Sequence, residues 1–342
     1  MTDKSRNYKK LIPYALILIG IFAVGLCYIT FTPISREKNK VLYVSQTTTL
    51  SDVADSVCTA SSCVRATLFR LGAELSGSAS RLRHGRYSLS DVSILGLLRN
   101  IRNGNQQPVR LTIPIVHTNE DLASFLGRQL KEPADSFLCA FSDTTLLSGY
   151  GIKPETVFCL FIPNTYEVYW TISPESLLSR MAKEAKAYWT EERVAKAEAL
   201  GLTKEEVITL ASIVEQETSA SSEKSRIAGL YLNRLRKPML LQADPTVKFA
   251  AGDFQLRRVA GAILKTDSPY NTYRYMGLPP GPICIPSVES IEAVLHAEKH
   301  SYLYMCANPD FSRTHVFTEN YSEHLKIAAA YVRALNERGI LK

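Results

Sequence analysis

The first feature along the chain is an unbroken apolar stretch near its start. Residues 11–31, LIPYALILIGIFAVGLCYITF, carry no charged side chain. A helix rises about 1.5 Å per residue, so a run of about 20 apolar residues spans the hydrocarbon core of a bilayer. A soluble helix is rarely apolar on every face. The pattern predicts a transmembrane helix over residues 11–31, preceded by a tail of residues 1–10.

A cleaved signal sequence is the main alternative for this stretch. Such a signal has a shorter apolar region and small residues at its cleavage site, whereas this run is long and ends in the bulky sequence YITF. Cys27 follows Leu26, where a lipoprotein signal has a small residue. The basic residues that flank the span are Lys4, Arg6, Lys9 and Lys10 before it, and Arg36, Lys38 and Lys40 after it. This small excess predicts a single-pass protein with its N-terminus in the cytoplasm and its larger part outside.

Short strand and helix patterns follow the span. They predict, in order, a strand at residues 41–44, a helix that opens at Thr49, a helix at 64–75, a strand at 85–89, a helix through Leu98 and Ile101, and a strand at 109–115. Strands and helices in this order over a short length are typical of a small α+β unit. We therefore expect a separate module over residues 41–116.

The rest of the chain is mostly helical in pattern. Thr203 and Glu206 form a capping box before the apolar run 207–214, which predicts a buried helix. The other expected elements are helices between residues 119 and 200 with a break at 158–169, a helix at 223–236, a loop-rich stretch at 238–286, a helix at 287–296, strands at 302–305 and 315–317, and a closing helix at 320–339. The expected fold class is α+β, with a transmembrane helix, a small module and a mostly helical region with long loops.

Composition narrows the range of functions. The net charge of +7 comes without a lysine-rich or arginine-rich run, so we expect no nucleic-acid partner. Hydrophobic residues make up 46% of the chain, enough to bury a core. The seven cysteines include no CxxC pair, and no glycine loop of the phosphate-binding kind occurs, so we expect no metal and no cofactor. Cys58 and Cys63 are close enough in sequence to pair in an oxidising compartment.

Two carboxylates end the apolar helix, at Glu215 and Glu217. Residues i and i+2 lie about 200° apart around an α-helix, so both cannot face one cleft. One is therefore catalytic at most, and ordinary surface acids are the alternative for both. An apolar setting such as that of Ile213 and Val214 raises the pKa of a carboxyl and suits a general acid.

Four motifs in a fixed order give the chain a family resemblance. They are ASIVEQET at residues 211–218, IAGLYLNRLRKPMLLQADPTV at 227–247, SPYNTY at 268–273 and GLPPGPI at 277–283. In this order they resemble the YceG-like (MltG) family of endolytic murein transglycosylases. The element FIPNTY at residues 161–166 also looks like part of the family pattern, and residues 41–116 are similar to its LysM-like subdomain. The resemblance implies a YceG-like catalytic region at 117–342 with its core at 203–342.

The resemblance also implies a reaction. Glu215 matches the family's catalytic glutamate. It would protonate the oxygen between N-acetylmuramic acid and N-acetylglucosamine, and its carboxylate would then take the proton of the muramic C6 hydroxyl as that oxygen attacks C1. The product would be a 1,6-anhydro end, and the cut would terminate elongation of a nascent glycan strand. Substrate-binding positions implied by the resemblance are Gln242, Asp244, Tyr270, Asn271, Thr272, Glu217, Asn164 and Tyr166.

Implied partners are peptidoglycan glycan strands, the bacterial inner membrane and penicillin-binding synthases. Taken singly, the polar residues among these positions suit turns as well as sugars, and Asp244 before Pro245 suits a turn. Glu217 is expected to support the site, with a salt bridge to Arg234 as the alternative, and a structural role is expected for His315. The sequence PIVH at residues 114–117 replaces an expected Pro-Glu-Gly, which leaves the junction after the module open.

Two other functions stay open. A muramidase-type hydrolase needs a second carboxylate about 5 to 9.5 Å from the first, and Asp244 is the one to test. A non-catalytic, membrane-tethered scaffold that binds glycan needs no acid at all.

Overall fold

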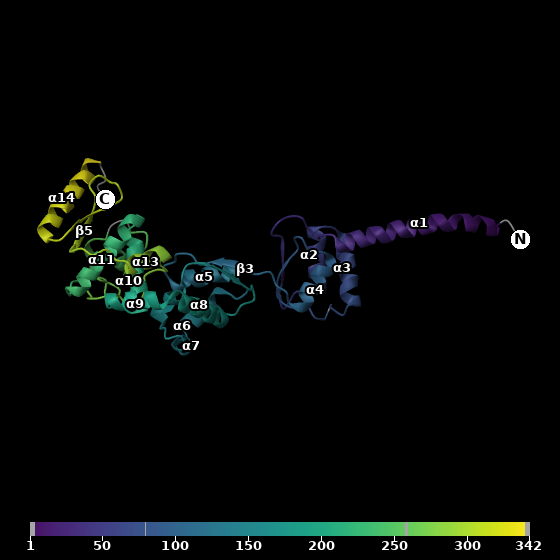
Figure 1. Cartoon of the computed structure of the whole chain (residues 1–342), viewed down its shortest axis with the longest axis horizontal. Helices are drawn as coiled ribbons and strands as arrows, with labels where there is room; N and C mark the ends of the chain where they lie inside the picture. The colour runs from purple at the N-terminus through teal and green to yellow at the C-terminus, as the bar shows by residue number, and fades with distance from the viewer. Residues whose placement is uncertain (1–3, 79, 257–258, 339–342) are drawn as a thin grey trace. The chain divides into compact units, whose positions relative to one another are not determined.

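The computed structural model describes residues 4–78, 80–256 and 259–338 (Figure 1). It divides the chain into two compact units, Met1–Arg110 with Glu167–Ile172, and Leu111–Tyr166 with Ser173–Lys342. Both are mixed α+β and mostly helical, which confirms the expected class. The expected tail of residues 1–10 and the end of the region 117–342 lie partly outside the described residues.

The first unit begins with the apolar helix α1, Lys4–Phe31. Its part Pro13–Phe31 is long and apolar enough to cross a membrane and is exposed. Its length, composition and place near the N-terminus fit a membrane anchor or a signal sequence.

A small three-helix module completes the first unit. Its elements are β1 (Val41–Val44), α2 (Leu50–Ala60), α3 (Cys63–Leu75), β2 (Gly85–Ser88), α4 (Ile94–Asn103) and the start of β3 (Val109–Thr112). Strands β1 and β2 pair antiparallel, with Val41 opposite Ser88. The buried core includes Val53, Phe69 and Leu97. The expected helices and strands form, and Cys58 and Cys63 are joined by a disulfide between α2 and α3.

The second unit holds the remaining elements (Figure 1). They are α5 (Asn119–Gln129), α6 (Ala134–Ser142), α7 (Thr144–Ser148), the 3-10 helix η1 (Pro154–Leu160), β4 (Thr165–Val168, at the boundary with the first unit), α8 (Pro174–Tyr188), α9 (Glu191–Leu200), α10 (Lys204–Glu217), α11 (Ser221–Arg236), α12 (Asp244–Ala251), the 3-10 helix η2 (Gly261–Lys265), α13 (Val288–Leu295), β5 (Tyr304–Ala307), β6 (His315–Thr318) and α14 (Tyr321–Glu337). Strand β3 pairs with β4, and β5 pairs antiparallel with β6.

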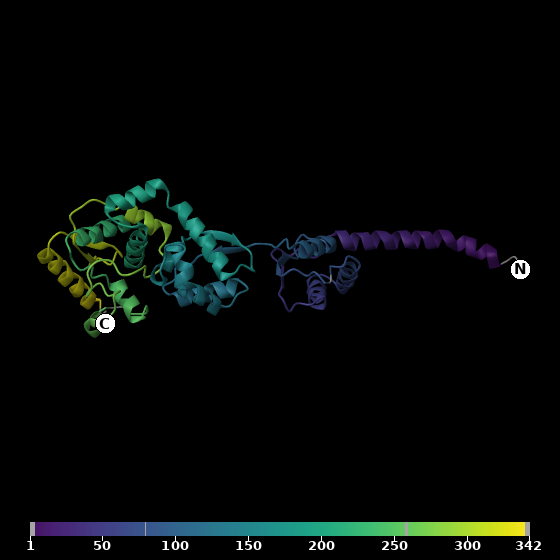
Figure 2. The ribbon, with the colours of Figure 1, turned by 90° about the horizontal axis from the view of Figure 1, so that it is seen from below.

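Helix α10 is the centre of this unit. The predicted capping box is confirmed, because Thr203 and Glu206 exchange side-chain and backbone hydrogen bonds at its start. Every residue from Val207 to Val214 is buried. Helices α10, α11 and α13 pack against one another, and together they form the green cluster seen in both ribbon views (Figure 1, Figure 2).

Two expectations about local structure are wrong. The strand expected over residues 109–115 ends at Thr112. The stretch 238–286 is loop-rich as expected and also contains α12 and η2, but Asp244 is the first residue of α12 rather than part of a turn. An Asp-Pro pair suits a helix start as well as a turn, because proline lacks an N–H that the first helical turn leaves unbonded anyway.

Gly229 sets how closely α11 approaches the segment after α13. A Cβ atom there would lie 2.3 Å from the carbonyl oxygen of Glu298. We predict that Gly229→Ala lowers the free energy of unfolding by about 1–3 kcal/mol. The reason is that the Glu298 backbone cannot move away from the added methyl group as the end of a flexible side chain could. Urea denaturation measures this loss; unchanged stability would show that the two segments separate freely.

Candidate active site

Glu215 and Glu217 leave the end of α10 in different directions, as their spacing predicts. Glu215 meets the start of α13, and Glu217 enters a pocket on another side. The two carboxyl groups therefore have different surroundings.

The Glu215 carboxylate is held by the first turn of α13. Its Oε2 accepts hydrogen bonds from the Ser287 backbone N–H at 3.1 Å, from the Ser287 hydroxyl and from the Ser290 hydroxyl at 2.5 Å. Lys224 Nζ lies 3.4 Å away, with a side chain only 5% exposed, and also contacts Glu289 at 2.8 Å. A helix N-terminus with its free N–H groups favours such a negative charge.

These contacts favour the charged form of Glu215. Burial alone would raise its pKa, but the bonds from Ser287 and Ser290 and the charge of Lys224 outweigh burial, and the pKa lies below its ordinary value. The expectation of a carboxyl kept protonated by apolar neighbours is therefore wrong for Glu215. Its environment is that of a structural carboxylate that ties α10 to α11 and α13.

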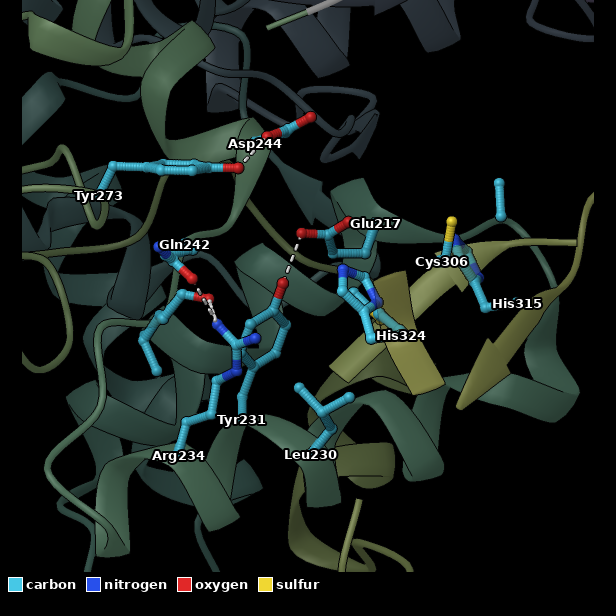
Figure 3. A pocket seen from close by; sticks show the side chains of 13 residues that line it. Glu217, Leu230, Tyr231, Arg234, Gln242, Asp244, Tyr273, Cys306, His315 and His324 are labelled. Atoms are coloured by element: carbon cyan, nitrogen blue, oxygen red, sulfur yellow. Dashed lines mark hydrogen bonds between the residues drawn. The ribbon is translucent and has the colours of Figure 1, made fainter. Parts of the chain in front are cut away.

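Glu217 lies in a pocket with a volume of about 370 Å³ (Figure 3). The lining residues are Glu217, Leu230, Tyr231, Arg234, Leu241, Gln242, Asp244, Tyr273, Met305, Cys306, Ala307, His315 and His324. Glu217 is half-buried as a residue, and its carboxyl is enclosed by the pocket atoms. Its Oε1 accepts a hydrogen bond of 2.6 Å from the Tyr231 hydroxyl.

The pocket raises the pKa of Glu217 to about 7. Burial is the main cause, and the negative charge of Asp244 adds to it; the Tyr231 hydrogen bond and the charges of Lys248 and Arg234 act in the opposite direction. The salt bridge considered between Glu217 and Arg234 does not form. The Arg234 guanidinium instead donates to the carbonyl oxygens of Leu303, Leu240 and Leu241 and to Gln242 Oε1.

The structure brings Gln242 and Asp244 into this pocket with Glu217. Gln242 has a positive φ of 51°, which is strained for a residue other than glycine, and its backbone N–H bonds Thr272 O at 3.1 Å. Asp244 Oδ1 accepts a 2.6 Å hydrogen bond from the Tyr273 hydroxyl (Figure 3). Both side chains are exposed at the pocket.

Other expected site residues have structural contacts instead. Asn271 is fully buried and donates to the carbonyl oxygens of Leu264 and Thr266, and buried Thr272 accepts from Ala243 N. These contacts are structural, and a substrate-binding role for Asn271 and Thr272 stays a prediction. They hold the loop before Tyr273 against α12.

The remaining expected residues lie outside the Glu217 pocket. Tyr166 is buried and donates to Ile162 O at 2.5 Å, and exposed Asn164 bonds its own neighbour Thr165 N. Tyr270 lines a different pocket of the same unit.

Sequence reasoning did not assign a site role to Tyr231, Tyr273 or His324. His324, from the C-terminal helix α14, lines the pocket, and burial lowers its pKa, so its imidazole is neutral at neutral pH. The sequence could have pointed to Tyr231 as a pocket residue, because Tyr231 falls on the same face of α11 as Arg234. His315 also lines the pocket but bonds Glu223 at 3.0 Å.

Among the described residues, no group of three or more His, Cys, Asp or Glu converges as a metal site.

A half-buried carboxyl with a raised pKa, in a polar pocket edged by tyrosines, is an arrangement that suits a general acid. The chain belongs to the YceG-like family, whose model matches residues 42–330.

Named relatives are similar to this chain over part of their length. An endolytic murein transglycosylase of Bacillus subtilis is 37% identical over 166 residues, which is 48% of this chain and 45% of the relative. One of Streptococcus pneumoniae is 28% identical over 288 residues, 74% of this chain and 51% of the relative. The chain thus spans about half the length of these relatives. A solved structure of a YceG-like protein from Listeria monocytogenes matches with a TM-score of 0.56 and 27% identity, over 84% of this chain and 98% of that one.

The Glu215 contacts lead to a stability prediction. Glu215→Gln should lower the free energy of unfolding at pH 7 by about 1–3 kcal/mol, because it removes the charge opposite buried Lys224. Since the folded-state pKa is lowered, this stabilisation is present above pH 4.5 and is lost as pH falls through the folded pKa. Denaturant titrations at several pH values measure it, and the more exposed Glu289→Gln is the control, with a smaller loss. An equal loss at all pH values would contradict an ionised Glu215.

The Glu217 pKa predicts the opposite pH dependence. A carboxyl whose pKa rises from 4.5 to about 7 on folding binds its proton more tightly when folded, so it costs stability as pH rises through that window. Glu217→Gln should therefore gain about 1–3 kcal/mol relative to the parent chain between pH 5 and pH 8. The same titrations test this, and a difference that does not change with pH would show an ordinary carboxyl.

Proposed function

We propose that this chain is a lytic transglycosylase that cuts the β-1,4 bond between N-acetylmuramic acid and N-acetylglucosamine in peptidoglycan. The observation that carries the proposal is the Glu217 carboxyl with its pKa near 7 in an open polar pocket. Membership of the YceG-like family and the names of the B. subtilis and S. pneumoniae relatives support the substrate.

Glu217 carries the acid–base role in this proposal, in place of the expected Glu215. A carboxyl with a pKa of about 7 is about half protonated at neutral pH, whereas one with a pKa of 4.5 or lower is protonated in well under about 1% of molecules. A general acid works best when its pKa lies near the working pH.

The reaction needs one carboxyl used twice. Protonated Glu217 gives its proton to the glycosidic oxygen as the bond from that oxygen to muramic C1 breaks. The Glu217 carboxylate then takes the proton of the muramic C6 hydroxyl while that oxygen bonds to C1. The leaving N-acetylglucosamine end keeps the first proton, the muramic residue ends as a 1,6-anhydro sugar, and Glu217 is protonated again.

Neighbouring side chains can hold the sugars for this reaction. Tyr231 stays neutral, since burial raises its pKa well above the ordinary value, and its hydroxyl fixes the Glu217 carboxyl. Gln242 and neutral His324 offer hydrogen-bond donors and acceptors to hydroxyl and N-acetyl groups. Burial and the bond to Asp244 raise the pKa of Tyr273 far above its ordinary value, so it too is an uncharged donor.

We further propose the cellular setting. The helix Pro13–Phe31 anchors the protein in the bacterial inner membrane, with the N-terminus in the cytoplasm and the catalytic region 117–342 outside. Residues 41–116 act as a LysM-like module. Cleavage near the membrane terminates nascent glycan strands, with penicillin-binding synthases as partners.

A muramidase-type hydrolase is the second candidate, because Asp244 lies in the same pocket as Glu217. There Asp244 would act as nucleophile or as base for water. Asp244 accepts a hydrogen bond from Tyr273 and lies on the first turn of α12. Both features favour a side chain that stays in place over one that acts as nucleophile or base.

The carboxyl assignment predicts a sharp difference between two variants. Glu217→Gln keeps size and hydrogen bonding but has no proton to give, so it should lower turnover of purified cell-wall sacculi by at least about 100-fold. Glu215→Gln should keep most turnover at temperatures where it is folded. Mass spectrometry of the released ends should find 1,6-anhydro sugars. Normal cleavage by Glu217→Gln would remove this residue from the mechanism, and reducing ends would favour the hydrolase.

The charge of Asp244 near Glu217 leads to a prediction about how kcat/KM depends on pH. Its charge helps to raise the Glu217 pKa, so the fall of kcat/KM above about pH 7 should move to lower pH in Asp244→Asn, by up to about one unit. Anhydro products should persist. Asp253→Asn, at an exposed position just after α12, is the control and should leave the profile unchanged. Loss of all activity in Asp244→Asn would support the hydrolase.

A further inference from the structure

A second hollow lies on another side of α12 from the Glu217 pocket. It combines a pocket of about 190 Å³ lined by Phe249 and Tyr270 with a smaller one of about 70 Å³ lined by Phe254 and Lys248. His117 lines both, so the two lie side by side. We name this hollow the aromatic groove, after His117, Phe249, Phe254 and Tyr270.

The four rings form a connected surface. His117 stacks on Phe254 with ring centroids 4.5 Å apart, Phe254 meets Phe249 at 6.2 Å, and Phe249 meets Tyr270 at 4.6 Å. Phe254 is 37% exposed, and the other three are half-buried. The groove thus keeps aromatic surface in contact with solvent, which a folded protein normally covers unless something binds there.

The groove and the Glu217 pocket are lined by neighbouring residues at two points of the chain. Gln216 and Pro245 line the smaller part of the groove, and their neighbours Glu217 and Asp244 line the catalytic pocket. Helix α12 rises about 1.5 Å per residue, so Phe249 lies about 8 Å along it from Asp244. The groove and the Glu217 pocket therefore flank the same end of α10 and the same start of α12.

The wall of the groove is closely packed and hydrogen-bonded. Gly281 approaches the Glu155 carbonyl so closely that a Cβ atom would lie 1.9 Å from it, and the same atom would lie 3.4 Å from the Tyr270 hydroxyl. Buried Asn271, fixed by two backbone carbonyls, follows Tyr270 directly. A preformed surface loses little entropy when a ligand settles on it.

We propose that the aromatic groove binds a pyranose ring of the glycan strand whose glycosidic bond lies at Glu217. The inference rests on the proposed function and names how far along the strand the protein makes contact. One face of a β-linked pyranose is covered by C–H groups, which pack on aromatic faces. The carboxylates of Glu120 and Glu155, both lining the larger pocket, accept hydrogen bonds from sugar hydroxyls at the edge of the ring.

The test is a binding series with glycans of increasing length. Full-length protein in detergent, with Glu217→Gln to prevent turnover, is titrated by calorimetry with N-acetylmuramyl-N-acetylglucosamine fragments from disaccharide to octasaccharide, with and without stem peptides. Phe254→Ala, Phe254→Leu and Phe254→Tyr are compared in that background. Tyr169→Ala, an exposed aromatic in the first unit, is the control.

The proposal expects affinity to rise with length until the groove is filled. Phe254→Ala and Phe254→Leu should lose about 10-fold in affinity for long fragments and nothing for the disaccharide, while Phe254→Tyr and Tyr169→Ala should match the background. If Phe254→Ala binds long fragments as tightly as its background does, the proposed role of the aromatic groove is overturned, while the proposed function is not. A loss confined to peptide-bearing fragments would assign the groove to the stem peptide and also overturn the proposal. If no fragment binds any variant, the proposed function fails together with the groove.

Discussion

The burial of one carboxyl without a countercharge is the constraint on which this site depends. Helix α10 is buried from Val207 to Val214, so its end is carried into the interior of the unit, and Glu217 emerges into a pocket rather than into bulk water. The Tyr231 hydroxyl is neutral and the Arg234 guanidinium is directed to backbone carbonyls, so among the described residues no cation forms an ion pair with the Glu217 carboxylate. Desolvation therefore prevails and raises the pKa of Glu217 to about 7.

At the same helix end, a different side-chain direction reverses the effect of the surroundings on the pKa of a carboxyl. Glu215, two residues earlier, is also largely removed from water, with a side chain 13% exposed. It meets two serine hydroxyls, a backbone N–H and a lysine, and these stabilise its charge more than burial opposes it. One carboxyl thus joins three helices and the other is free to exchange a proton. The positioning of the acid depends on this division, since the Glu215 contacts hold α10 against α13.

Sequence patterns predicted the parts of the fold that follow from local chemistry. The apolar first helix, the capping box at Thr203 and the strand and helix order of the small module could be read from periodicity and capping residues. Glu215 and Glu217 also have different surroundings, as their spacing along the helix predicts. Which of them does so could not be read, because apolar neighbours in sequence say nothing of Ser287, Ser290 and Lys224, which come from other elements. The buried roles of Asn271 and Thr272 and the helix at Asp244 depend in the same way on contacts between distant segments.

The most direct test is a site-specific titration of the glutamate carboxyls. Full-length protein carrying carboxyl-13C glutamate is followed by NMR across the pH range, with Glu217→Gln and Glu215→Gln used to assign resonances. The account predicts one carboxyl that titrates near pH 7, is absent from Glu217→Gln and is present in Glu215→Gln. A Glu217 resonance that titrates in the ordinary carboxyl range, or a high-pKa resonance that disappears in Glu215→Gln, would contradict it.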